Sequence, residues 1–301
     1  MSSWLESLKN LVRNGQPRFQ HRSESDSLDP VMTTELQRQE LWEQLKTVPS
    51  VEALGIVGPM GAAGVRTGGE SGWTLRFWFE AWRVAGGDLQ TSHLAINRKV
   101  SHDELQSFRA SITPFAVLSV RVRIAAENAS SESQALLEEI LGADNTDTEL
   151  RGIAAQLQQP VKHTDAVFGI LLLDRRVGWH RGTTEWKGRK VELNVPVNRD
   201  TRLEEGLGTA HELRTNQNLW DQKMAECAVH QLLTLRNEVW AGQDPRMDAN
   251  EFRQRLQIES ITAHSDGRFR FWYDGGELFL GHQILVEGSL RTGPTEASIH
   301  G

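Results

Sequence analysis

Residues 257–301, QIESITAHSDGRFRFWYDGGELFLGHQILVEGSLRTGPTEASIHG, decide the fold of the C-terminal half of this chain. Two turn signals, Ser265-Asp266-Gly267 and Asp274-Gly275-Gly276, separate runs of aromatic and aliphatic residues, which predicts an antiparallel meander. Because side chains alternate along a strand, one face of the middle strand carries Phe269, Phe271 and Tyr273, and the other carries Arg268, Arg270, Trp272 and Asp274. The first face is the more apolar, and we expect it to face the core.

Upstream of the meander, a long amphipathic helix is predicted over residues 211–240. Its apolar stripe consists of Trp220, Met224, Ala228, Leu232, Leu235 and Val239. Residues 168–196 predict a strand followed by a hairpin around Lys187-Gly188, and residues 250–256 predict a short helix. Strands followed by helices and then by strands indicate an α+β fold, in which one long helix packs a mostly antiparallel sheet.

The N-terminal half predicts a smaller β-rich module with short helices. Strands are expected over residues 73–80 and 115–125, and helices over 101–113, 132–141 and 147–158. The glycine-rich stretch GIVGPMGAAG, residues 55–64, lacks the Gly-Lys-Ser/Thr ending of a phosphate-binding loop, so it is better interpreted as a turn between strands. A barrel of the oligonucleotide-binding type is compatible with this pattern.

The sequence pattern divides the chain into three parts. We expect N-terminal helices and a linker over residues 1–49, the β-rich module over 50–160 and the α+β domain over 161–301. Residues 1–15 have the pattern of an amphipathic helix, which would either dock on its own domain or bind a partner or a membrane surface. A second short helix is expected over residues 34–47.

Composition restricts the partners of the chain. Its 301 residues carry a formal net charge of −7, which argues against broad binding to nucleic acid or to an anionic membrane. No apolar run approaches the length of a membrane span. The single cysteine, Cys227, excludes an intramolecular disulfide and fits a cytoplasmic protein, and we expect a packed thiol there. Another protein is therefore the expected partner, and the sequence indicates neither a cofactor nor an oligomeric state.

Asp274, Glu277 and His282 surround one predicted turn and form a candidate site. One histidine and two carboxylates are chemically sufficient for zinc, manganese or iron. On a regular strand that starts at Glu277, however, Glu277 and His282 would point to opposite faces. A hydrogen-bonded core histidine is therefore favoured over a metal ligand, unless Gly281 forms a bulge.

Three further places carry candidate binding residues. Trp272, flanked by charged residues, is either a recognition residue or a cross-strand packing residue. Asp174-Arg175 follow a predicted strand and form either a structural ion pair or part of a site. Glu226 and His230 are four residues apart on the long helix and form either a solvated pair or an acid–base pair.

The C-terminal half resembles a family of bacterial proteins known as domain of unknown function 2262. The resemblance rests on four segments, which are FGILLLDRRVGW at 168–179, LWDQKMAECAVHQLLTLRNEVW at 219–240, EFRQRLQIESI at 251–261 and DGRFRFWYDGGELFLGHQILVEG at 266–288. It covers about residues 150–301 and implies a bacterial, cytoplasmic α+β protein without an assigned activity. Members often have two adjacent acidic residues where this chain has Asp274-Gly275-Gly276-Glu277, which weakens the case for a fixed acidic pair.

Two functions are compatible with these observations. The absence of catalytic motifs and the many tryptophans favour a non-enzymatic recognition protein, for example an immunity-like or regulatory binding module. The alternative is a metal-dependent, hydrolase-type enzyme that uses Asp274, Glu277 and His282.

Overall fold

The computed structural model describes residues 42–66, 72–125, 133–197, 201–240 and 245–301. The chain divides into two units, one up to Gln159 and one from Pro160. The helix predicted over residues 1–15 lies outside the described residues, and of the helix predicted over 34–47 the described part, residues 42–47, is helical. No helix in these described ranges is long and apolar enough to cross a membrane.

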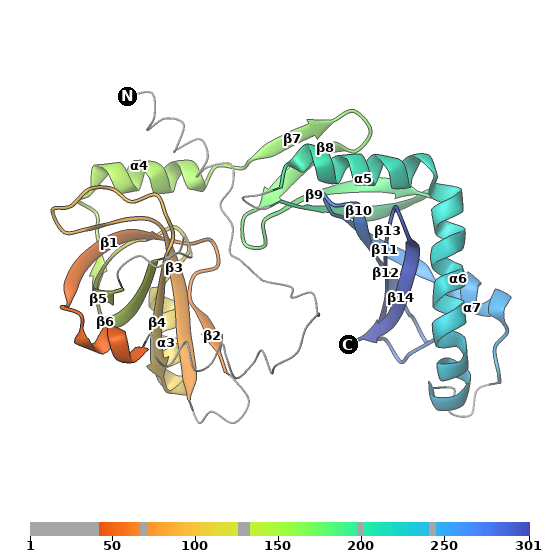
Figure 1. Ribbon diagram of the computed structural model, residues 1–301, viewed down its shortest axis with the longest axis horizontal. Coiled ribbons are helices and arrows are strands. Elements are labelled where there is room, and N and C mark those ends of the chain that lie inside the picture. Colours follow the sequence, from red (N-terminus) through yellow and green to blue (C-terminus); the bar gives the residue numbers. More distant parts are fainter. Residues whose placement is uncertain (1–41, 67–71, 126–132, 198–200, 241–244) are drawn as a thin grey trace. The chain divides into compact units, whose positions relative to one another are not determined.

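The N-terminal unit is built around a closed ring of five strands (Figure 1). Strand β1 (Val51–Val57) pairs with β3 (Trp73–Val84) and β5 (Val117–Ile124), and β5 pairs with β6 (Ser133–Ala143). Strand β4 (Leu94–Val100) closes the ring through an antiparallel pair with β3 and a parallel pair with β6. The short strand β2 (Ala63–Val65) extends from β3. This connectivity is that of a Greek-key barrel of the oligonucleotide-binding type.

Two helices pack on the barrel. Helix α3 (His102–Ser111) starts with a capping box, in which the Glu104 backbone N–H donates to Ser101 Oγ and the Ser101 N–H donates to the Glu104 carboxylate. Its Leu105 is 1% exposed and belongs to the barrel core. Helix α4 (Thr148–Leu157) instead packs on the outside of the barrel, against Ile56, Ala81 and Val117.

The helix predicted over residues 132–141 is wrong, because this segment forms strand β6. The segment, ESQALLEEIL, includes good helix formers, but Ser133, Ala135 and Leu137 alternate and are buried in the barrel. Backbone pairing of β6 with both β4 and β5 completes the ring, and this non-local pairing outweighs the local helix propensity.

The C-terminal unit contains one eight-stranded sheet, in the order β14-β13-β12-β11-β10-β9-β8-β7. The strands are β7 (Lys162–Asp165), β8 (Gly169–Asp174), β9 (Trp179–Trp186), β10 (Arg189–Pro196), β11 (Gln257–Ala263), β12 (Arg268–Asp274), β13 (Gln283–Ser289) and β14 (Gly293–His300). Of its pairings, β10–β11 is parallel and the other six are antiparallel. The predicted α+β fold, with a mostly antiparallel sheet in this half, is confirmed.

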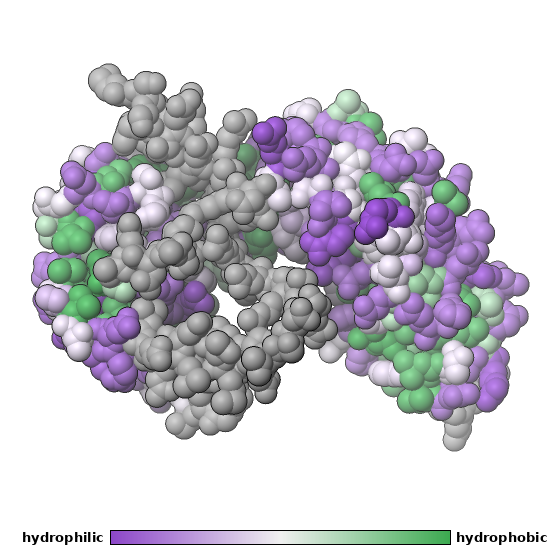
Figure 2. Space-filling view, in the orientation of Figure 1, coloured by the Kyte–Doolittle hydropathy of each residue, from purple (hydrophilic) through white to green (hydrophobic). Residues whose placement is uncertain are grey.

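The helix predicted over residues 211–240 is divided into three parts. Helix α5 (Leu203–Thr215) is followed by its C-cap residue Asn216 and then by α6 (Gln217–Leu235). A π-helical turn, η1 (Arg236–Trp240), extends α6. Four residues of the predicted stripe are buried, namely Trp220, Met224, Ala228 and Leu232. Leu235 and Val239 are 38% and 68% exposed and, unlike Leu233 and Trp240, do not pack against the core. Figure 2 shows hydrophobic side chains among polar ones at the surface in this region.

One face of the sheet forms the core with α5, α6 and the short helix α7 (Ala249–Arg255). As predicted, Phe269, Phe271 and Tyr273 point into this core and are at most 3% exposed. Edge-to-face contacts join Phe271 to Trp186, with centroids 5.2 Å apart, and Phe269 to Trp220, with centroids 5.1 Å apart. The predicted hairpin at Lys187-Gly188 is also present, and both residues have positive φ, as a two-residue turn requires.

Candidate functional site

The structure gives Asp274, Glu277 and His282 three separate local roles. The strand predicted from Glu277 begins only at Gln283, so residues 275–282 form a loop. The alternation of side chains along a strand therefore does not determine where Glu277 and His282 point. Asp274 Oδ1 accepts a 2.7 Å hydrogen bond from the Gly276 backbone N–H, and Glu277 is exposed. His282 Nδ1 donates to the Phe279 carbonyl at 2.8 Å, and its ring lies 5.2 Å from Trp240. His282 is thus a hydrogen-bonded, half-buried packing residue.

Asp174 and Arg175 lie far from that loop. Asp174 is on β8 and Asp274 on β12, with β9, β10 and β11 between them, which separates the two strands by roughly 19 Å at a strand spacing of about 4.8 Å. Burial alone would raise the pKa of Asp174, but hydrogen bonds from Arg176 and the charges of Arg176 and Arg181 hold it below its usual range. Asp174 is therefore an ionised partner of arginines at the end of its strand, and Arg175 is buried beside it.

The helix and cysteine candidates also have structural partners. Glu226 accepts a 2.8 Å hydrogen bond from Gln222 Nε2, so its hydrogen-bond partner lies one turn before it rather than at His230. Cys227 is unpaired and half-buried, and burial raises the pKa of its thiol. A raised pKa lowers the thiolate fraction, which disfavours nucleophilic chemistry. Among the described residues, no group of three or more His, Cys, Asp and Glu side chains could hold a metal ion.

The second face of the C-terminal sheet carries a continuous row of polar side chains. Residues that pair across strands share one face. Arg270 on β12 pairs with Glu287 and Thr262, Thr262 pairs with Asn194, and Asn194 pairs with Arg181. The helices of this unit that the structure describes pack on the opposite side. We call this surface the open face, because these helices do not cover it, and define it by Trp272, Arg270, Thr262, Asn194, Arg181 and Leu172. Thr262 and Asn194 at its centre are buried, so its accessible parts lie on either side of them.

Trp272 occupies the C-terminal part of the open face. It lies between its cross-strand neighbours Ser260 and Leu285 and is half-buried, as expected for an outward position on β12. Its indole makes an edge-to-face contact with His300, with ring centroids 5.2 Å apart. Next to it, the Arg270 guanidinium forms an ion pair with Glu287, so aromatic and charged groups meet at one place.

Asn194 and Arg181 of the open face were missed by sequence reasoning. Asn194 is 3% exposed; its amide Nδ2 donates to Glu192 Oε1 at 2.8 Å, and its Oδ1 has no hydrogen-bond partner among the described atoms. Arg181, opposite Asn194, lies over the ring of Trp179 at 5.7 Å and 3.6 Å from Asp174. The available signal was the alternation of polar residues with Val191, Leu193 and Val195 along β10.

The far end of the open face is apolar and exposed. Ile170 and Leu172 on β8 are 59% and 47% exposed and lie on the same face as Arg181. Val167, in the β7–β8 turn, is 56% exposed. Apolar side chains in such a group are typical of surfaces that bind other molecules.

Comparison with known families covers both units. Residues 165–299 match the family described as "Uncharacterized protein conserved in bacteria (DUF2262)", which confirms the resemblance seen in the sequence. Residues 38–157 match a second family, described as "Domain of unknown function (DUF7021)". No curated protein matches the chain. Among solved structures, the chain is similar to a small single-stranded DNA-binding protein from Streptomyces coelicolor, with 13% identity over 33% of this chain and 94% of that one and a TM-score of 0.21.

Proposed function

We propose that this protein is a non-enzymatic recognition module, of an immunity-like or regulatory kind, whose open face binds another protein. The observation that carries the proposal is the position of Trp272, which is half-buried on the face opposite the helices instead of being part of the core. A partly exposed tryptophan supplies contact area at little entropic cost, and tryptophan and arginine dominate the energetic centres of protein interfaces.

The charges of the open face favour a protein over a nucleic acid as its partner. Arg270 is already paired with Glu287, and Arg181 lies close to Asp174, so carboxylates balance these two arginines. The chain as a whole has a net charge of −7, which opposes approach to a phosphate backbone. The exposed Ile170 and Leu172 would add apolar contact area at the other end of the same face.

Site-specific photo-crosslinking tests the proposal. A photoreactive phenylalanine derivative replaces Trp272 in one variant and Leu280, which is 76% exposed in the 275–282 loop, in a matched control. In a bacterial lysate, position 272 should crosslink to one defined protein, and position 280 should not. Excess unlabelled wild-type chain should suppress the crosslink, whereas unlabelled Trp272→Ala chain should not.

The stability of Trp272→Ala separates recognition from packing. If Trp272 serves recognition, the melting temperature should stay close to that of the wild type. A loss of about 3–5 kcal/mol, typical of a buried aromatic residue, together with no specific crosslink, would contradict the proposal.

A further inference from the structure

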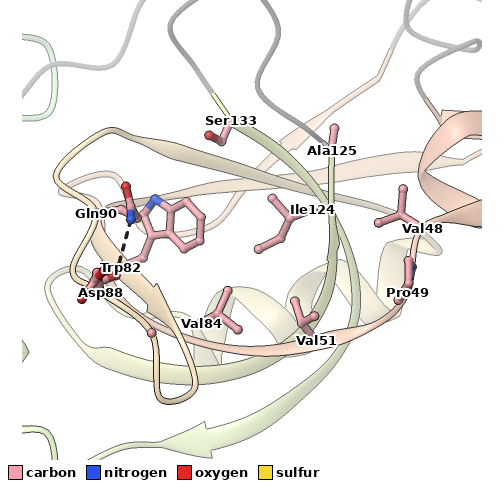
Figure 3. A pocket seen from close by; sticks show the side chains of 11 residues that line it. Val48, Pro49, Val51, Trp82, Val84, Asp88, Gln90, Ile124, Ala125 and Ser133 are labelled. Atoms are coloured by element: carbon pink, nitrogen blue, oxygen red, sulfur yellow. Dashed lines mark hydrogen bonds between the residues drawn. The ribbon is translucent and has the colours of Figure 1, made fainter.

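The barrel of the N-terminal unit has two different ends. Helix α3 follows β4 and precedes β5, and its Leu105 and Phe108 pack into one end of the barrel core. At the other end, β1 begins at Val51, β3 ends at Val84 and β5 ends at Ile124. A cavity of about 660 Å³ lies between these strand ends (Figure 3).

The walls of the cavity are mainly hydrophobic. Val51, Val84 and Ile124 pack against the barrel core but remain half-buried, and Figure 3 shows their side chains around one space, with Trp82 across from them. Trp82 is 7% exposed, and its Nε1 donates to the Ser92 carbonyl at 3.0 Å. That hydrogen bond satisfies the only polar atom of the indole, so the ring offers the cavity an apolar surface.

Few polar groups accompany these walls. Gln90 lies beside Trp82, and its Nε2 donates one long hydrogen bond, of 3.5 Å, to the Asp88 carbonyl. Ser133 lies at the rim of the cavity. Asp88 is the only charged residue among the described residues of the lining, which gives the site no positive charge with which to hold an anion.

We propose that this cavity binds a small, uncharged, largely apolar molecule with one polar group for Gln90. The volume falls in the range of about 300–1,000 Å³ that is typical of small-molecule sites, and such sites combine hydrophobic walls with a few polar groups. An anion is disfavoured by the Asp88 carboxylate, and a strongly hydrated ion would lose its water shell against the valine and isoleucine side chains.

A neutral fused-ring probe tests this site in the full-length chain. Binding of 5-fluoroindole, followed by its ¹⁹F NMR signal, should saturate with a Kd of about 1 mM or tighter. The anion 5-fluoroindole-2-carboxylate should bind at least about tenfold more weakly. No saturable binding of the neutral probe, or equal binding of the anion, would overturn the proposal.

Two filling variants and a matched control locate the probe. Ile124→Trp should fill the cavity and abolish binding, and Val84→Phe gives an independent filling variant if the first one does not fold. Val65→Trp adds the same indole at a position that is 46% exposed on β2 and outside the lining, so binding should persist. Probe binding that survives both filling variants in folded protein would refute the site.

Trp272→Ala should leave probe binding unchanged, so this test is independent of the proposed recognition function.

Discussion

At the scale of single residues, burial differs sharply between side chains of the same type on one helix. Leu232 and Leu235 both belong to the apolar stripe of α6, but Leu232 is 4% exposed and Leu235 is 38% exposed. Leu232 belongs to the core of the C-terminal unit, whereas Leu235 is not among the residues that pack against this core. Their sequence pattern is the same, and only the partner surface distinguishes them.

This difference predicts unequal effects of two alanine substitutions. Leu232→Ala should lower the free energy of unfolding by about 2–5 kcal/mol, because it removes buried methyl groups and leaves a cavity. Leu235→Ala should cost less than about 1 kcal/mol. Urea denaturation of both variants measures the two values, and equal losses would show that the face is not buried as described.

A second residue-scale prediction concerns His180, which is 6% exposed on β9. Burial lowers the pKa of His180 to about 4; the nearby His163 lowers it further, and Glu204 opposes the shift. In the unfolded chain the same histidine takes up a proton near pH 6.5, so between about pH 6.5 and 4 the unfolded state binds more protons. The contribution of His180 to stability is therefore complete above pH 6.5 and falls by about 3 kcal/mol as the pH decreases towards 4.

His180→Gln should accordingly reduce the loss of stability on acidification. The measurement is the free energy of unfolding at several pH values between 7.5 and 4. His264 also has a pKa lowered to about 4, mainly by burial, so part of the acid sensitivity should remain. The same substitution at the exposed His300 serves as the control for replacing a histidine by glutamine. Identical profiles for His180→Gln and the wild type would contradict the burial of His180.

At the scale of elements, local signals predicted most of the secondary structure. The capping box at Ser101, the turn at Ser265-Asp266-Gly267 and the Lys187-Gly188 hairpin are present where their residue types predict them. Segment 132–141 is one exception, since its composition is helical and its alternation is short. Pairing with the preceding strand β5 and with the more distant strand β4 determined that it forms β6.

Two adjacent leucines on β6 provide a test of this strand. Leu137 points into the barrel and is 3% exposed, while Leu136 is half-buried on the other side. Leu137→Ala should therefore cost about 2–5 kcal/mol, and Leu136→Ala clearly less. Chemical denaturation distinguishes them, and a larger loss at Leu136 would reverse the assigned faces of the strand.

At the scale of the whole molecule, each unit has its own hydrophobic core. The barrel is centred on Phe77, Phe79 and Val120, and the C-terminal unit on Trp186, Phe271 and Met224. Separate cores allow separate folding, because each unit buries its apolar surface by itself. The recognition surface proposed on the open face and the cavity at the barrel end are therefore built by different parts of the chain.

We expect the two units to unfold in two steps. Calorimetry of the full chain should show two transitions, with Leu137→Ala shifting one of them and Leu232→Ala shifting the other. Each variant removes buried surface from a single core, so the other transition should remain in place. One cooperative transition that shifts as a whole in both variants would mean that the units are energetically coupled.

The sequence by itself determined the features that depend on near neighbours in the chain. Alternation over residues 269–273 specified which side of β12 enters the core and left Trp272 on the other side, because strand side chains alternate whatever lies around them. The tertiary structure alone decided that Asn194 is buried beside Thr262 of β11 and that β6 pairs as a strand with β4. These features depend on contacts between segments far apart in the sequence, and local propensity and periodicity contain no information about such contacts.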